Sequence, residues 1–315
     1  MTKNAVVTGA AGFIASHLVD LLLDKGFSVI GIDNLRTGSI QNLVEPLKNS
    51  NFQLLKEDIC NKRFPDLVKE DIDVIFHLAA ISSVLLSVEN PILVNDTNVV
   101  GTVNVLEMAR KHDVERFVLS SSAAVYGNPE SLPVREETAL NPLSPYAASK
   151  ISAEMYSISY GNLYGMTPII FRYFNVFGPR QENSEYSGVI PIFINQGLQN
   201  NDITIEGDGR QTRSFIFVND VVEATYLGSQ LNDASGQILN LSGTDSIRIL
   251  DLARLIKNRI PDSTSNIVHR DAREGDVKDS IGSMERTSEV LGFSPTVPFE
   301  SGLDRTASWY RSHLD

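Results

Sequence analysis

The sequence has little cysteine and no excess of positive charge. Cys60 is the single cysteine among 315 residues, which excludes an internal disulfide framework and a thiolate metal cluster and indicates a reducing compartment, the cytoplasm. Lys and Arg number 27 against 39 Asp and Glu, a net charge of −12. This balance argues against nucleic acid or an anionic membrane as the main partner. An anionic small ligand would need local arginines or helix N-termini to oppose that field.

The sequence also lacks a long apolar run, and we expect no secretory leader. No apolar stretch approaches the roughly 18–20 residues that a membrane-spanning helix needs. Met1–Asn4 leads directly into a strand-like segment, unlike a signal peptide. With 42% hydrophobic and 21% charged residues, the composition is that of a folded globular chain. We therefore expect a soluble cytoplasmic protein that does not bind nucleic acid or membranes.

Short β-branched segments alternate with helical patterns along the first half of the chain. This order predicts βαβ units, and therefore a doubly wound parallel Rossmann-type sheet. Shorter mixed elements follow and predict a smaller C-terminal α/β cap. We expect residues 1–175 to form the dinucleotide-binding domain, with segments returning from later in the chain, and 176–315 to form mainly the cap. The predicted strands are Asn4–Thr8, Phe27–Ile32, Phe52–Leu55, Val74–Phe76, Phe117–Leu119, Thr167–Phe171, Ile203–Ile205 and Phe215–Val218. The predicted helices are Phe13–Leu23, Pro91–His112, Pro145–Tyr164, Val189–Leu198, Asp220–Leu231, Ile249–Arg259 and Phe299–Arg311.

A glycine-rich turn joins the first strand to the first helix. Gly9 and Gly12 stand where a dinucleotide fold needs a tight turn and a bare backbone beside a helix N-terminus, with Ala15 as the third small residue. Such a turn can also be purely structural. Asp33, at the end of the second strand, strengthens the cofactor interpretation because its carboxylate can hold ribose hydroxyls and would repel a 2′-phosphate. The pattern predicts NAD rather than NADP, although Arg36 lies nearby.

Two smaller signals agree with a cofactor site. Asp58-Ile59 follows the third strand, where an adenine would lie, although a helix cap explains the aspartate equally well. His77-Leu78-Ala79-Ala80 follows the fourth strand, and its small residues allow a flat ligand to approach the backbone. We expect His77 to pack or hydrogen-bond locally and give it no catalytic role.

Tyr146 and Lys150 form a Y-x-x-x-K pair on one face of a predicted helix. A lysine ammonium and a positively charged nicotinamide both favour the phenolate form of tyrosine, which otherwise titrates near 10. Ser122 lies in a serine run after the fifth strand, at the carboxyl edge where open α/β sheets bind ligands. Alone the pair could be an exposed helix pair; together with the glycine turn and Asp33 it predicts a redox centre.

These motifs together resemble the extended short-chain dehydrogenase/reductase superfamily, and within it the UDP-hexose 4-epimerases. The resemblance covers essentially the whole chain. It rests on Thr8-Gly9-Ala10-Ala11-Gly12-Phe13-Ile14, Asp33-Asn34, His77-Leu78-Ala79-Ala80, Asn98-Val99-Val100-Gly101-Thr102, Ser122-Ala123-Ala124-Val125-Tyr126-Gly127, Tyr146/Lys150, Arg172-Tyr173-Phe174-Asn175-Val176-Phe177-Gly178, Gly207-Asp208-Gly209-Arg210-Gln211-Thr212-Arg213 and Arg273-Glu274-Gly275-Asp276.

The resemblance implies a tightly held NAD, a UDP-sugar substrate, no metal and a homodimer formed through helices near 91–112 and 143–164. It implies that Tyr146 takes the proton of the sugar 4-hydroxyl while C4 gives its hydride to NAD⁺, that the 4-keto sugar turns, and that the hydride returns to the opposite face. The implied catalytic residues are Ser122, Tyr146 and Lys150. The implied cofactor-binding residues are Gly9, Gly12, Phe13, Ile14, Asp33, Asn34, Thr37, Gly38, Asp58, Ile59, Leu78, Ala79, Ala80, Asn98, Tyr146, Lys150 and Phe174. The implied substrate-binding residues are Ser83, Ser122, Tyr146, Asn175, Gly188, Val189, Thr204, Ile205, Glu206, Arg213, Arg273, Asp276 and Ser280.

The resemblance also bears on which sugars fit. The residue seven positions after Arg273 is Ser280, which corresponds to a position that gates the space beside the sugar C2 substituent. A serine leaves room for an N-acetyl group, so we expect UDP-N-acetylglucosamine and UDP-N-acetylgalactosamine to be interconverted, and UDP-glucose and UDP-galactose too. Ser280 can alternatively be a small loop residue without this role.

Three positions depart from the family pattern and leave substrate detail open: Leu86 replaces a frequent basic residue, Ser214 an acid, and Ser283 a frequent Asp. Two other functions stay open. A nucleotide-sugar 4,6-dehydratase or decarboxylase shares this fold, but a dehydratase needs an acid and base beside Ser122, where Ala123-Ala124 cannot transfer protons. A non-catalytic NAD-binding regulator would predict a damaged centre, and this one is intact.

Overall fold

The core of the molecule is a twisted parallel sheet. The structure is a computed structural model that describes residues 2–182, 188–231, 236–271 and 277–313. Seven strands lie in the order β10-β6-β5-β4-β1-β2-β3, and all neighbouring pairs are parallel. The strands are β1 (Asn4–Thr8), β2 (Ser28–Asp33), β3 (Phe52–Lys56), β4 (Val74–His77), β5 (Arg116–Ser122), β6 (Thr167–Tyr173) and β10 (Gln237–Leu241). The strand order reverses between β1 and β4, which is where a doubly wound sheet opens a crevice for a ligand.

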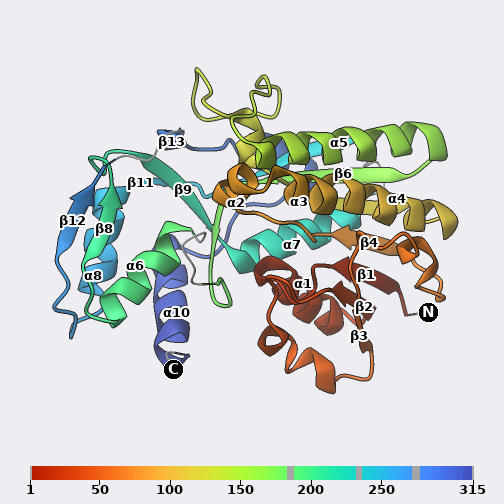
Figure 1. The fold of residues 1–315 in the computed structure, drawn as a ribbon, viewed down its shortest axis with the longest axis horizontal. Coiled ribbons are helices and arrows are strands. Elements are labelled where there is room, and N and C mark those ends of the chain that lie inside the picture. The colour runs from red at the N-terminus through yellow and green to blue at the C-terminus, as the bar shows by residue number, and fades with distance from the viewer. Residues whose placement is uncertain (1, 183–187, 232–235, 272–276, 314–315) are drawn as a thin grey trace.

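Helices cover both faces of this sheet, as the sequence pattern predicts (Figure 1). On one face lie α1 (Phe13–Asp24) and α7 (Val218–Ser229), which bury apolar side chains such as Leu18 and Val221 in one core cluster. On the other lie α4 (Gly101–Lys111) and α5 (Pro145–Tyr164), which bury Val105 and Ala153 in a second cluster. The Rossmann-type fold predicted from the sequence is confirmed.

The helix predicted over residues 91–112 is interrupted in the structure. It consists of α3 (Pro91–Asn95), one π-helical turn (Asp96–Val100) and α4. Gly101 permits close packing after this turn, because a Cβ there would lie 2.5 Å from Cδ1 of Ile59. Single π turns often mark functional positions, and this turn carries Asn98.

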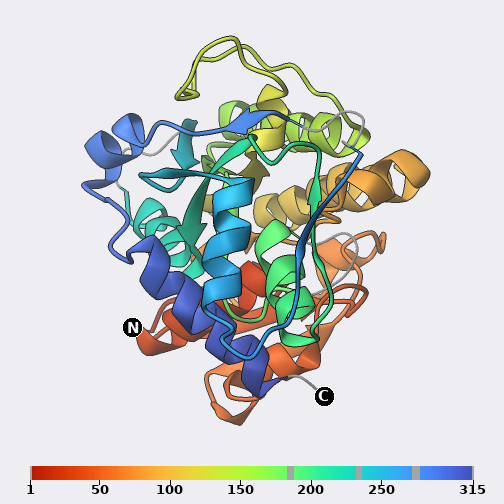
Figure 2. The same ribbon diagram turned by 90° about the vertical axis from the view of Figure 1, so that its left-hand side faces the viewer.

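The remaining elements form the cap at the carboxyl edge of the sheet (Figures 1 and 2). Its central strand β9 pairs with β7, β11 and β13, while β8 pairs with β12. The cap elements are β7 (Asn175–Phe177), α6 (Val189–Leu198), β8 (Ile203–Glu206), β9 (Thr212–Phe217), β11 (Ser246–Arg248), α8 (Ile249–Asn258), β12 (Ile267–Arg270), β13 (Asp279–Ser280) and α10 (Phe299–Ser312).

Several elements were not predicted from the sequence. They are α2 (Val84–Glu89), α9 (Glu285–Leu291) and the strands β7, β10, β11, β12 and β13. The chain returns from the cap to the large sheet through α7 and β10, so the segment after residue 175 does not belong to the cap alone. Within the described residues, no helix is long and apolar enough to cross a membrane.

Candidate active site

The turn between β1 and α1 has the geometry of a dinucleotide cradle. Gly9 adopts a φ of +72°, and a Cβ there would lie 2.8 Å from Cα and N of Ala79. Only glycine combines that conformation with so close an approach. Gly12 caps α1 without any side-chain hydrogen bond, and no acidic residue lies in the first turn. The positive end of the helix dipole is therefore open to an anionic group.

Asp33 ends β2 directly beside this turn and is 7% exposed. Its Oδ2 accepts the amide of Ala11 at 2.9 Å, and its Oδ1 accepts the amide of Leu35 at 2.7 Å. Burial raises the pKa of Asp33, while the two amides oppose the shift. Each oxygen keeps a second lone pair for a hydroxyl. A Cβ on Gly38 would lie 2.9 Å from Oδ2, so Gly38 closes the loop around the carboxylate.

The groups around Asp58 bind one another. Asn34 Nδ2 donates to Asp58 Oδ2 at 2.8 Å, and the Cys60 amide donates to Oδ1 at 2.8 Å. The Arg36 guanidinium lies 3.7 Å from Asp58. Burial favours a higher pKa for Asp58, but these hydrogen bonds and the arginine outweigh it and lower the pKa. Arg36 is thus drawn to Asp58 rather than to Asp33, while Thr37 is exposed at the loop surface.

Two polar residues under the crevice have structural partners. His77 bridges Thr8 Oγ1 at 2.7 Å and Thr102 Oγ1 at 2.9 Å. Burial, together with the charge of Lys150, lowers the pKa of His77 to about 3, so the ring is neutral. Asn98 Oδ1 accepts the Ile81 amide at 2.8 Å, and Nδ2 donates to the Ile81 carbonyl at 3.0 Å. Through these two hydrogen bonds, Asn98 holds the loop that follows β4.

Other residues predicted for the cofactor surround the same crevice. Ala79 donates its amide to Thr8 Oγ1 at 3.2 Å, which fixes the backbone after β4. Phe174 is 8% exposed, and a Cβ on Gly282 would lie 2.6 Å from its ring. Phe13, Ile14, Leu78 and Ala80 are half-buried at the two βα turns, whereas Ile59 is buried. Their roles toward a cofactor stay predictions.

The predicted reactive side chains meet at the end of β5. Tyr146 and Lys150 lie on one face of α5 and are 8% and 5% exposed. Lys150 Nζ donates to the carbonyl of Ser120 at 2.9 Å. Ser122 hydrogen-bonds with Tyr146 and also accepts the amide of Ala124 at 3.2 Å. The structure therefore brings the three predicted catalytic residues together.

Burial has the largest effect on the pKa values of this centre that the protein's own groups produce. Burial raises the pKa of Tyr146, although its hydrogen bond with Ser122 opposes the shift. Burial lowers the pKa of Lys150 to about 8, and the Glu154 carboxylate opposes that shift. The side chains of the chain alone thus do not stabilise a phenolate. The expected lowering of the Tyr146 pKa, which the Lys150 ammonium and a positive nicotinamide would produce together, stays a prediction.

A cavity of about 870 Å³ opens beside Tyr146 and Ser122 and extends into the cap. It lies between the carboxyl edge of the sheet and the segments around β8, β9 and β13. Its lining includes the predicted substrate residues Ser83, Ser122, Tyr146, Asn175, Gly188, Val189, Thr204, Glu206, Arg213 and Ser280. Ile205 instead points into the apolar core, with 0% exposure, because side chains alternate along β8.

The polar residues at the cap side of the cavity also hold the 277–280 segment. Arg213 Nη2 donates to the Val277 carbonyl at 2.6 Å, and Nη1 donates to the Lys278 carbonyl at 2.9 Å. Asn175 Nδ2 lies 3.3 Å from Ser280 Oγ. Thus Arg213, Asn175 and Ser280 are organised around one short segment. Arg273 and Asp276, also predicted to bind substrate, lie outside the described residues.

The three residues that depart from the family pattern each take part in a hydrogen bond. Ser214 and Ser242 share a buried hydroxyl hydrogen bond at 2.6 Å. Ser283 Oγ accepts the amide of Glu285 at the start of α9. Leu86 lies in α2, and its backbone N–H donates a hydrogen bond to the Ser83 hydroxyl at 3.0 Å.

Sequence reasoning missed several residues of the site. Gln211, Arg270 and Asp279 line the cavity but were not predicted as site residues, although Gln211 lies within the family motif at residues 207–213. Glu154 continues the spacing of Tyr146 and Lys150 by one more turn, a signal that could have been used. Among the described residues, no cluster of three or more His, Cys, Asp or Glu side chains could hold a metal ion.

The glycine turn, the acid that ends β2 and the Tyr–Lys pair on α5 define a short-chain dehydrogenase/reductase of the extended type. Residues 6–306 match the model of the GDP-mannose 4,6-dehydratase family, and the chain belongs to that family.

Relatives of the chain cover nearly its whole length. It is 38% identical over 311 residues to a UDP-glucose 4-epimerase of Mycolicibacterium smegmatis, covering 98% of this chain and 99% of the relative. It is similar to a UDP-N-acetylglucosamine 4-epimerase of Methanobrevibacter ruminantium, solved with UDP-N-acetylmuramic acid, at a TM-score of 0.94, with 36% identity and 99% of both chains covered. A UDP-glucuronic acid 4-epimerase of Bacillus cereus, solved with UDP-glucuronic acid and NAD, matches at 0.93 with 31% identity, covering 99% of this chain and 100% of that one.

Proposed function

We propose that the protein is an NAD-dependent UDP-sugar 4-epimerase that interconverts UDP-glucose with UDP-galactose and UDP-N-acetylglucosamine with UDP-N-acetylgalactosamine. The observation that carries this proposal is that Tyr146 and Ser122 hydrogen-bond to each other and line the large cavity, with Lys150 one helical turn from Tyr146. The relatives named above, which are epimerases of UDP-sugars, support it.

The residues at the sheet edge have distinct chemical roles in this proposal. Tyr146 accepts the proton of the sugar 4-hydroxyl and later returns it, and Ser122 hydrogen-bonds the reacting oxygen. Lys150 keeps a positive charge near the phenol and favours its ionised form. Because burial alone raises the pKa of Tyr146, the positive charges around the phenol decide how readily it takes the proton.

The crevice residues fit NAD. Gly9 and Gly12 leave the backbone bare at the N-terminus of α1, where a pyrophosphate is stabilised. Asp33 offers lone pairs to ribose hydroxyls and repels a 2′-phosphate, and Arg36 is held by Asp58. Phe174 lies beside the centre and would cover the nicotinamide. When bound, NAD supplies the hydride acceptor for C4 of the sugar.

The cavity suits a nucleotide sugar. We assign the diphosphate to Asn175 and Arg213, with Arg273, because guanidinium forks bind phosphate oxygens in pairs and offset the negative charge of the protein locally. The nucleoside would lie toward Thr204 and Glu206. A volume of about 870 Å³ supports a sugar that turns between the two halves of the reaction. Ser280, which is small and lines the cavity, supports acceptance of N-acetylated sugars.

A 4,6-dehydratase is the second candidate considered from the sequence. Ala123 and Ala124 line the cavity directly after Ser122, at the place where a dehydratase needs an acid and a base. Methyl groups cannot transfer protons, so the epimerase is favoured.

We also infer a homodimer located in the cytoplasm. Large apolar side chains are exposed along α2, α3 and α5, including Val88 at 64%, Ile92 at 73% and Leu163 at 69%. Such a face supports association with a second copy through these helices. Light scattering of the purified protein tests this: a mass near 34.7 kDa would reject the dimer.

The test of the function uses the purified protein without added cofactor. Incubation with each of the four UDP-sugars, followed by chromatography, should give the corresponding 4-epimer. Denaturation should release NAD(H). Bound NADP would contradict the Asp33 assignment, and a 4-keto-6-deoxy product would identify a dehydratase instead.

A further inference from the structure

A carboxylate lies one helical turn beyond Lys150. Glu154 is placed on the face of α5 that carries Tyr146 and Lys150, because the three positions are four residues apart. Its exposed fraction is 0%. A buried carboxylate is costly unless it is fully compensated, and the proposed chemistry above gives Glu154 no task.

Two residues of the sheet hold this carboxylate. Arg172 Nε donates to Glu154 Oε1 at 3.0 Å, and Arg172 Nη2 donates to Oε2 at 2.7 Å. The Ser121 hydroxyl donates to Oε1 as well. The pair is thus a bidentate charge-assisted contact, which is the most directional kind of ion pair.

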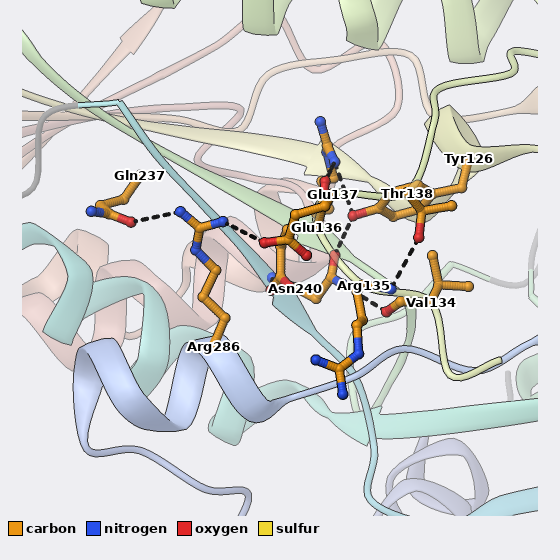
Figure 3. A network of polar contacts seen from close by, with 10 residues as sticks. Tyr126, Val134, Arg135, Glu136, Glu137, Thr138, Gln237, Asn240 and Arg286 are labelled. Atoms are coloured by element: carbon orange, nitrogen blue, oxygen red, sulfur yellow. Dashed lines mark hydrogen bonds and ion pairs between the residues drawn. The ribbon is translucent and has the colours of Figure 1, made fainter. Parts of the chain in front are cut away.

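The arginine is itself anchored on its far side. Arg172 Nη1 donates to the Tyr126 hydroxyl at 2.9 Å and to the Glu136 carbonyl at 3.1 Å. Tyr126 donates to Asn240 Oδ1 at 2.7 Å, and the backbone N–H of Asn240 donates to Glu136 Oε1 at 2.8 Å. Figure 3 shows Tyr126, Glu136 and Asn240 in this network. The guanidinium therefore cannot follow Glu154 if α5 shifts.

Three consecutive residues at the end of β5 each bind one of the polar residues on α5. The Ser120 carbonyl accepts from Lys150, Ser121 donates to Glu154, and Ser122 hydrogen-bonds with Tyr146. The Glu154 contact thus fixes the register of the helix on the strand.

We propose that Glu154, clamped by Arg172 and Ser121, is a positioning residue that keeps Lys150 charged and holds the Tyr146–Lys150 face of α5 in register with Ser122. Tyr146 and Glu154 lie one helical turn on either side of Lys150 on α5, His77 on β4 interacts with Lys150, and Arg172 on β6 lies beyond Glu154. His77 is neutral, so among the described residues Glu154 is the anion that acts on Lys150. Without it, Lys150 and Arg172 would be buried cations lacking a counter-charge.

The direct test follows the NMR signal of Lys150 as a function of pH in the NAD-loaded protein labelled with carbon-13 lysine. The Lys150 signal is assigned by its absence in Lys150→Arg. Burial already lowers the pKa of Lys150 to about 8, against the opposing charge of Glu154. In Glu154→Gln the titration midpoint should fall by about one pH unit. Turnover of the UDP-sugar should fall about fivefold at pH 8 and less at pH 7, in proportion to the charged fraction of Lys150. An unchanged midpoint would overturn the proposal.

A second variant separates positioning from folding. Glu154→Gln/Arg172→Gln replaces the ion pair with a neutral amide pair, and such replacements are often tolerated. The proposal requires this folded double variant to keep the low Lys150 midpoint and the low turnover. Recovery of both wild-type values would show that the pair is only structural.

Glu107→Gln is the matched control. Glu107 accepts the same two-pronged contact from Arg110, at 3.1 and 2.7 Å, but lies at the surface of α4. This variant should change neither the Lys150 midpoint nor the turnover. The turnover readout rests on the proposed function, whereas the titration does not. Inactivity of the wild type on every UDP-sugar would therefore reject the epimerase while leaving the role of Glu154 decided by the titration.

Discussion

The two halves of the site are built by different means. The cofactor crevice comes from neighbouring turns at Gly9, Gly12 and Asp33, held by nearby backbone amides. The substrate cavity joins distant segments, because Arg213 of β9 binds the carbonyls before β13 and Asn175 reaches Ser280. The crevice is therefore fixed mainly by backbone geometry, whereas the cavity depends on side-chain contacts between distant segments.

This difference predicts how each half responds to substitution. A change in the crevice should affect folding and cofactor retention together, because the backbone itself forms the site. A change in the cavity should alter which substrate is used and leave the fold intact. Tyr146 stands where the two halves meet, so its loss should affect the reaction with either sugar class.

The largest effect is expected for Tyr146→Phe. The ring packs as before and only the proton acceptor is lost, so turnover should fall by about 10²–10⁴-fold. NAD content and the thermal unfolding midpoint should stay at wild-type values. Near-normal epimerisation by the folded variant would remove Tyr146 from the mechanism.

The next effect tests the crevice. In Gly9→Ala, the new Cβ would lie 2.8 Å from the Ala79 backbone at a φ of +72°, so we expect loss of NAD and a stability loss above the roughly 1–2 kcal/mol of a left-handed alanine alone. Gly26→Ala is the matched control, with a φ of +82° and no atom within 4 Å. It should lose only that smaller amount and retain NAD. Equal behaviour in urea unfolding and NAD content would contradict the steric argument.

Elements that depend on the local sequence were predicted better than elements that form only by pairing with distant strands. The bounds of β1, α5 and α6 agree with the prediction, because their patterns and caps are local. By contrast, β10 was missed: its strand is short, contains the polar Asn240, and forms only through pairing with β6. Two-residue β13 likewise exists only against β9.

The same distinction holds for the site. The i, i+4 spacing sufficed to place Tyr146 and Lys150 on one face of α5. It could not reveal that burial raises the pKa of Tyr146 and lowers that of Lys150, because desolvation depends on the packed environment. The contacts of Arg213 with the 277–278 carbonyls were also beyond local pattern.

A third prediction tests the cavity. Ser280→Tyr should abolish reaction with N-acetylated sugars by overpacking and spare UDP-glucose and UDP-galactose. Ser280→Ala is the control, because it keeps the space and loses only the hydroxyl that Asn175 contacts at 3.3 Å. Both sugar classes should remain substrates of the alanine variant in initial-rate assays. If the tyrosine variant lost both activities equally, Ser280 would not be a gate.

The smallest effect concerns the pH dependence of the reaction, which depends on Tyr146 and Lys150 where the crevice and the cavity meet. Burial lowers the pKa of Lys150 to about 8, so its ammonium is present below that pH and is lost as the pH rises through it. Since the charge favours the Tyr146 phenolate, kcat/KM for UDP-glucose should decline above about pH 8. Lys150→Arg keeps its charge at every accessible pH and should lose this alkaline decline even if its overall rate is lower. Lys150→Ala should move the acidic limb to higher pH, because Tyr146 then lacks its neighbouring cation. If Lys150→Arg showed the same alkaline decline at the same pH as the wild type, the decline would be due to a group other than Lys150.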